Sequence, residues 1–144
     1  MGYAVLGAWL VQAAVGTMLL VGWARHARGA AAGSVLSHAM LMVGFLVPWS
    51  LFIASGSPFW AWAAVAVLFV GIPFGDAMMV GRSRSIRGET NPGLRDYGSA
   101  VGTVFSGLMP PKVTFHALFS AVVFFGSVAL AVVATIGAAA GGPV

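Results

Sequence analysis

The chain has 144 residues, of which 60% are hydrophobic and only 7% are charged, with a formal net charge of +4. Since a soluble domain carries about 25% charged residues, this composition excludes an ordinary water-soluble domain and predicts an integral membrane protein. The absence of cysteine excludes disulfides, thiolate metal sites and cysteine nucleophiles. The few basic residues lie in short loops, so we interpret them as orientation signals and expect no nucleic-acid partner.

Four apolar runs are each long enough to cross a membrane, since a helix rises about 1.5 Å per residue and the hydrocarbon core is about 30 Å thick. The first three follow one another through short connectors, and the fourth comes after a longer polar segment. The predicted spans cover residues 3–23, 35–54, 59–80 and 113–138. We therefore predict an all-α integral membrane protein in which residues 1–144 form a single four-helix up-down bundle.

The polar segment between the third and fourth spans divides into two parts. Residues 81–97 hold four arginines and two acids and are predicted to form a water-exposed loop. Residues 98–111 are apolar enough to touch lipid, but they are too short and too rich in glycine to cross it. We expect this second part to be an interfacial or re-entrant segment before the fourth helix.

The basic residues also predict the topology. Arg25 and Arg28 follow the first span, and all other Lys and Arg residues lie between the third and fourth spans. The positive-inside rule then places both basic loops in the cytoplasm and both termini outside. Trp49, Trp60 and Trp62 fall near the predicted outer interface, as an aromatic belt would. We expect the location to be a cell membrane, specifically the bacterial inner (plasma) membrane.

Three uncharged features concern helix packing. Pro48 and Pro73 lie inside the second and third spans, where each removes a backbone donor and favours a kink. Gln12 lies near the middle of the first span. An unpaired amide is costly in lipid, so we expect Gln12 to bond to a neighbouring helix.

His38, Asp76 and His116 are the ionisable side chains within the spans. The predicted topology places all three near the cytoplasmic ends of different helices, within about 5 to 10 Å of one membrane surface. Such residues are expensive in lipid and usually face the bundle interior. The alternative for Asp76 is an ion pair at the headgroup boundary with Arg82 or Arg84.

This constellation leaves several cofactor hypotheses open. His38 and His116 on different helices could ligate haem b, or they could bind a quinone with Asp76 as orienter or proton acceptor. A copper site is another candidate, with His38, Met42, Met79 and His116 as ligands, because thioethers and imidazoles suit Cu(I).

The sequence contains no metalloprotease, nucleophile-elbow or phosphate-loop motif, so we expect no catalytic activity of its own. We predict a small polytopic membrane subunit or accessory protein that packs with other membrane subunits or with copies of itself in the lipid bilayer. The first alternative is a redox membrane anchor that binds haem b or quinone through His38, His116 and Asp76. The second is a small oligomeric transporter or lipid-handling protein.

Overall fold

The computed structural model describes residues 1–27, 29–90, 92–93 and 95–141. Arg28, which belongs to the first predicted basic loop, lies outside the described residues, as do two positions of the loop 81–97 and the last three residues of the chain. The described residues form helices and contain no strand, which confirms the predicted all-α class. The helices are α1 (Gly2–His26), α2 (Ala32–Gly44), α3 (Leu46–Ser55), α4 (Pro58–Arg87), α5 (Asp96–Phe105) and α6 (Pro111–Ala139).

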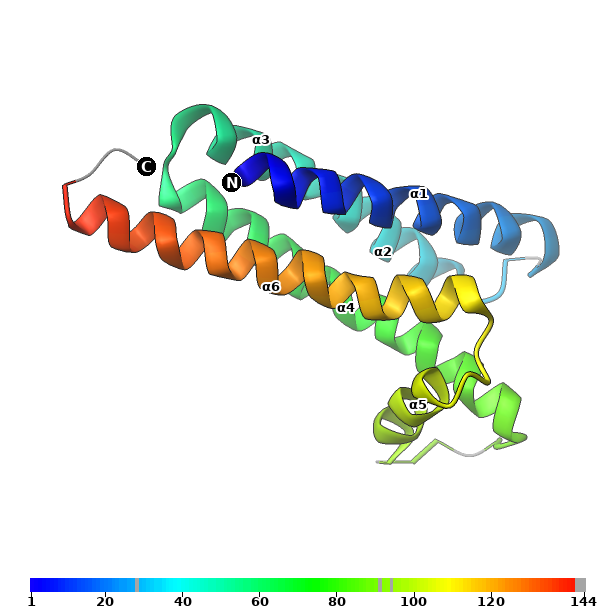
Figure 1. Ribbon diagram of the computed structural model, residues 1–144. Helices are drawn as coiled ribbons and strands as arrows, with labels where there is room; N and C mark the ends of the chain where they lie inside the picture. The colour runs from blue at the N-terminus through cyan, green and yellow to red at the C-terminus, as the bar shows by residue number, and fades with distance from the viewer. Residues whose placement is uncertain (28, 91, 94, 142–144) are drawn as a thin grey trace.

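Four helical segments are long and apolar enough to cross a membrane, as the sequence predicts. Three of them are α1, α4 and α6, and the fourth is the combination of α2 and α3 over Ala32–Ser55. The start of α1 and the end of α6 lie at the same end of the bundle, while α5 lies beside α4 at the other end (Figure 1). We call this other end, where Arg25, Arg82 and Lys112 lie, the basic end.

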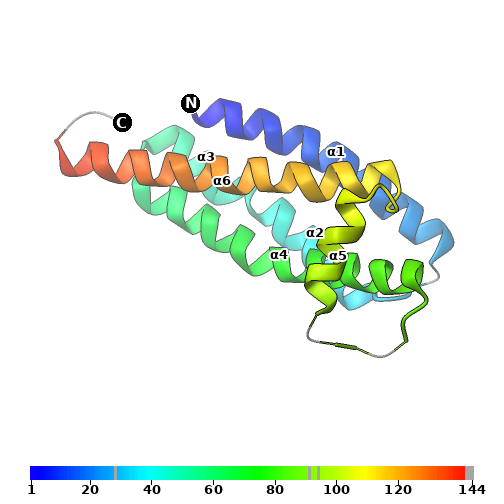
Figure 2. The same ribbon diagram turned by 60° about the horizontal axis from the view of Figure 1, so that its bottom comes forward.

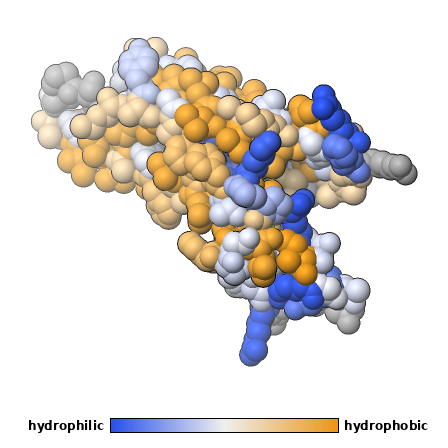
Figure 3. Space-filling model, turned by 45° about the vertical axis from the view of Figure 1, so that its right-hand side comes forward, coloured by the Kyte–Doolittle hydropathy of each residue, from blue (hydrophilic) through white to orange (hydrophobic). Residues whose placement is uncertain are grey.

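The order of the helices around the bundle follows from their contacts. α6 packs against both α1 and α4, and α4 packs against both α2 and α3. Within the described residues, α2 and α6 share no close backbone contact, so these two helices face each other diagonally. On the face that Figure 3 shows, the bundle is mostly apolar, and strongly polar residues collect at the basic end and around α5.

The break between α2 and α3 lies next to Pro48. α2 ends at Gly44, the residue four positions before the proline whose carbonyl would accept a hydrogen bond from residue 48 in a regular helix. Phe45 separates the two helices and keeps a helical backbone conformation. α4, in contrast, continues through Pro73 to Arg87.

Helix α5 occupies part of the segment predicted to be interfacial, and it crosses α4 at the basic end (Figure 2). Thr103 Oγ1 donates to the carbonyl of Ser99, so the buried Ser83 hydroxyl donates to Thr103 Oγ1 over 2.8 Å. Asp96 lies 3.7 Å from Arg84 and 3.9 Å from Arg87. These contacts attach α5 firmly to the last turns of α4.

An aromatic stack forms the core at the opposite end. Trp49 is fully buried and its ring centroid lies 5.2 Å from those of Phe45 and Phe52. Its Nε1 donates to the carbonyl of Gly2 over 3.1 Å, which joins α3 to α1. The expectation that Trp49 belongs to an aromatic belt is therefore wrong, because its ring packs inside the protein and reaches neither lipid nor water.

We predict that Trp49→Ala lowers the free energy of unfolding by about 3 kcal/mol or more, since it leaves a cavity and removes a hydrogen bond. Thermal unfolding in detergent micelles measures this loss. Phe59→Ala is the control, because Phe59 is 66% exposed and its removal leaves no internal cavity. Equal destabilisation by both substitutions would contradict the assignment of Trp49 to the core.

Candidate functional site

The structure brings His38 and His116 together near the basic end. His38 is on α2 and His116 is on the diagonally opposite α6, so the rings approach the bundle axis from opposite sides. Their centroids are 6.2 Å apart and their planes meet at 75°. Both side chains are half-buried, and two imidazoles in this position form a site that only the tertiary structure can create.

A backbone hydrogen bond holds the ring of His38. Its Nδ1 lies 3.0 Å from the carbonyl oxygen of Gly71 on α4. A carbonyl oxygen only accepts hydrogen bonds, so Nδ1 carries the proton and Nε2 of the neutral ring has the free lone pair. This arrangement is typical of a metal-ligating histidine, whose other ring nitrogen donates to a carbonyl or carboxylate.

Two glycines make room for the histidine rings. A Cβ atom on Gly75 of α4 would lie 2.9 Å from Cε1 of His38, and one on Gly16 of α1 would lie 3.0 Å from Cε1 of His116. Neither distance is compatible with an undisturbed ring. A side chain at either position would press on an imidazole, so glycine lets the helix backbones approach the rings this closely.

Gln12 fixes the helix that carries His116. Its Nε2 donates to the carbonyl oxygen of His116 over 2.7 Å, which confirms the prediction that this amide bonds to a neighbouring helix. The imidazole Nδ1 of His116 is buried and has no hydrogen-bond partner among the described residues. The ring is thus positioned by its backbone while one of its nitrogens remains available.

Asp76 lies on the same cavity wall as the two histidines. Within the described part of the chain it forms no ion pair, and Arg84 and Arg87 pair with Asp96. The alternative in which Asp76 pairs with Arg82 or Arg84 does not hold in this structure. The Asp76 carboxylate instead raises the pKa of the Tyr97 phenol on α5, and partial burial of the phenol raises it further.

A cavity of about 1690 Å³ surrounds these groups. All the helices except α3 contribute to its wall, and most of that wall is apolar. Its titratable and charged lining residues are His26, His38, Asp76, Arg82, Tyr97, Lys112 and His116. The cavity is larger than the pockets of about 300–1,000 Å³ that typically hold small molecules.

Basic side chains line this cavity at the basic end. Arg82 and Lys112 are exposed and make no ion pair among the described residues. Lys112 precedes His116 by four positions, so the two lie on one face of α6. The cavity therefore combines imidazoles in its interior with cations that could bind carboxylates of a ligand.

The other predicted copper ligands lie in the same cavity but have different contacts. Met42 lines the wall together with Met79, and the Met42 methyl group packs against Gly71. Among the described residues, no three His, Cys, Asp or Glu side chains converge in the way a metal ion held by such ligands would need. The available metal chemistry is therefore that of two histidines, with thioethers at the periphery.

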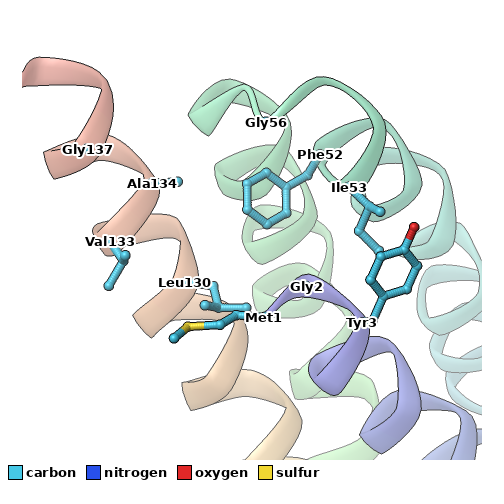
Figure 4. Close-up of a pocket in the computed structure, with 10 residues that line it drawn as sticks. All are labelled: Met1, Gly2, Tyr3, Phe52, Ile53, Gly56, Leu130, Val133, Ala134 and Gly137. Carbon is cyan, nitrogen blue, oxygen red and sulfur yellow. The ribbon is translucent and has the colours of Figure 1, made fainter. Parts of the chain in front are cut away.

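A second cavity of about 420 Å³ lies at the other end of the bundle. Figure 4 shows its lining from α1, α3 and α6, with Tyr3, Phe52 and Ile53 on one side and Leu130 on the other. The Tyr3 phenol is the polar side-chain group among its lining residues.

Comparisons with known proteins found no match for this chain. No protein-family model, no curated protein and no solved structure matches the chain. Any function must therefore be argued from the geometry of the site.

Sequence reasoning missed Tyr97, Gly16 and Gly75 as parts of the site. Tyr97 was assigned to a water-exposed loop, and its side chain reaches Asp76 only because α5 folds back across α4. Gly75 lies four residues after Gly71, a spacing that predicts close helix packing and gives no sign of a histidine neighbour. The position of Gly75 directly before Asp76, an acid within a span, was a sign that Gly75 could belong to the site. The sequence cannot show which imidazole ring packs on Gly75.

We predict that Asp76→Asn lowers the pKa of Tyr97 toward its ordinary value of about 10, because a nearby carboxylate disfavours the phenolate. Ultraviolet titration of the phenolate measures this change. The measurement is made in a Tyr3→Phe background, which leaves Tyr97 as the only tyrosine. An unchanged Tyr97 pKa would show that the two side chains do not interact.

Proposed function

We propose that the protein is a membrane redox subunit that binds haem b between His38 and His116. The observation that carries this proposal is the 6.2 Å separation of the two ring centroids across the bundle axis. An imidazole nitrogen binds a metal at about 2.0 to 2.1 Å. Because a ring centroid lies about 1.2 Å behind that nitrogen, two histidines that would hold one metal ion from opposite sides need centroids about 6.5 Å apart, close to the observed separation.

The surroundings of both rings support axial ligation. The hydrogen bond from His38 Nδ1 to the Gly71 carbonyl orients the ring, leaves Nε2 as the ligand and increases its basicity. On the opposite side, Gln12 holds the backbone of His116. Haem iron ligated by two histidines carries single electrons, and the protein contributes the ligands, an apolar environment and exclusion of water.

The cavity also matches the amphipathic character of haem b. Its apolar wall suits a macrocycle, and Arg82 and Lys112 at the basic end suit two carboxylates. The proposal keeps the expected role of a membrane subunit without catalysis of its own, since an electron carrier must exchange electrons with a donor and an acceptor. The predicted orientation would place this haem on the cytoplasmic side of the membrane.

We predict that the purified protein, reconstituted with haemin, shows a Soret band with low-spin haem b character. His38→Ala or His116→Ala should abolish the low-spin spectrum, because each removes an axial ligand. Absorption and pyridine haemochrome spectra measure the haem content and type. If the ring planes keep their 75° angle, the ferric protein should show a strongly anisotropic low-spin electron paramagnetic resonance signal.

The third histidine of the chain provides the matched control. His26 is exposed and its Nδ1 lies 2.9 Å from the carbonyl of Gly22 within the same helix. His26→Ala should leave the spectrum unchanged. A colourless wild-type protein after reconstitution, or equal haem loss in all three variants, would refute the haem proposal.

We predict that Gly75→Ala and Gly16→Ala each weaken haem binding by about tenfold, since overpacking costs about 1–3 kcal/mol and displaces a ligand ring. Haemin titration of the apoprotein measures the dissociation constant. Gly7→Ala on α1 is the control, because a Cβ atom there meets no atom within 4 Å. Unchanged affinity in both site variants would show that these glycines do not position the histidines.

A further inference from the structure

The wall of the large cavity formed by Asp76 and Tyr97 has no role in haem ligation. Asp76 comes from α4 and Tyr97 from α5, which folds back across α4 after the polar loop. The two side chains therefore share one wall through tertiary structure alone. A carboxylate and a phenol beside an apolar cavity form a polar pair suited to a ligand that carries hydroxyl or carbonyl groups on an apolar ring.

We propose that Asp76 and Tyr97 bind a membrane quinol beside the haem site and that this quinol is the reductant of the haem. The inference rests on the proposed function, because it assigns the electron donor of that site. It goes further by giving a binding role to residues outside the haem ligands and by naming the chemical class of the substrate.

The cavity has room for both ligands. Its volume of about 1690 Å³ exceeds the range of about 300–1,000 Å³ of pockets for a single small molecule. Phe105 of α5 lines it and is 72% exposed, so the cavity has an apolar rim on the outer surface of the protein beside α5. A lipid-soluble quinol with an apolar tail could therefore reach it from the bilayer.

The two polar side chains can recognise both redox forms of such a ligand. The Asp76 carboxylate accepts a hydrogen bond from a quinol hydroxyl, and the Tyr97 phenol donates one to a quinone carbonyl. The phenol of Tyr97 is protonated near neutral pH, since the carboxylate of Asp76 raises its pKa above the ordinary value of about 10. Because Asp76 forms no ion pair among the described residues, its carboxylate is available to the ligand.

The reaction balances without another reactant. One quinol would reduce the ferric haems of two protein molecules, one electron to each, and the products would be one quinone, two ferrous haems and two protons. Asp76 is the first acceptor when an O–H bond of the quinol breaks. The proton then passes to water at the basic end, where Tyr97 is 55% exposed.

The test uses haem-loaded full-length protein in detergent micelles and decylubiquinol as the probe. Stopped-flow absorption should show reduction of ferric haem, with one quinol consumed for two haems. Asp76→Asn should slow this reduction by about 100-fold, as expected for loss of a proton acceptor. Tyr97→Phe should slow it by about tenfold through loss of one hydrogen bond. Both variants should keep the wild-type Soret band and their reduction by dithionite.

Tyr3→Phe is the matched control, because Tyr3 lies at the other end of the bundle and should leave the rate unchanged. Potentiometric titration of each variant identifies any slowing caused only by a changed haem potential. Haem-loaded wild-type protein that decylubiquinol does not reduce would overturn the quinol proposal and leave haem binding intact. The quinol proposal would also be overturned if Asp76→Asn and Tyr97→Phe reduced haem at the wild-type rate, or if their slower rates were fully explained by changed haem potentials. Wild-type protein that binds no haem would overturn both proposals.

Discussion

The close approach of the His38 and His116 rings inside the bundle is the constraint on which the rest of the site depends. Two imidazoles are costly to bury among apolar helices unless they gain hydrogen bonds or ligands. The structure meets this requirement for His38 with the Gly71 carbonyl. His116 keeps a buried nitrogen without a partner in the described structure, which supports the proposal that the pair binds a ligand.

The helix arrangement around the histidines follows from this constraint. α2 and α6 must lie on opposite sides of the axis, and α1 and α4 must pass close to the rings. Gly16 and Gly75 permit that approach, and the hydrogen bond from Gln12 keeps α6 at the required height along α1. The hydrophobic effect does not drive helix association in lipid, so such close contacts and hydrogen bonds carry much of the specificity.

The basic end combines three kinds of chemistry in a short distance. The imidazoles lie in the bundle, Asp76 and Tyr97 lie on the cavity wall, and Arg82 and Lys112 line the same cavity at its charged end. α5 makes this combination possible because its contacts to Ser83, Arg84 and Arg87 fold the loop back onto α4. This combination best supports the proposed function, in which haem binds next to a group that accepts protons.

The sequence by itself determined the membrane class and the four spans, because apolar runs of this length have few other stable solutions. It also located His38, Asp76 and His116 near one end, since the helical rise converts residue position into depth. The rotation of each helix about its axis was not predictable. These helices are apolar on nearly every face, so no polar stripe indicates which side points inward.

Only the tertiary structure decided which residues meet. It placed Asp76 beside Tyr97, while Arg84 and Arg87 of the loop pair with Asp96. It also placed Trp49 in the core, where the ring stacks on Phe45 and packs at a tilt against Phe52. These contacts depend on helix rotation and on the path of α5, which are set by the packing of the whole bundle rather than by any local run of residues.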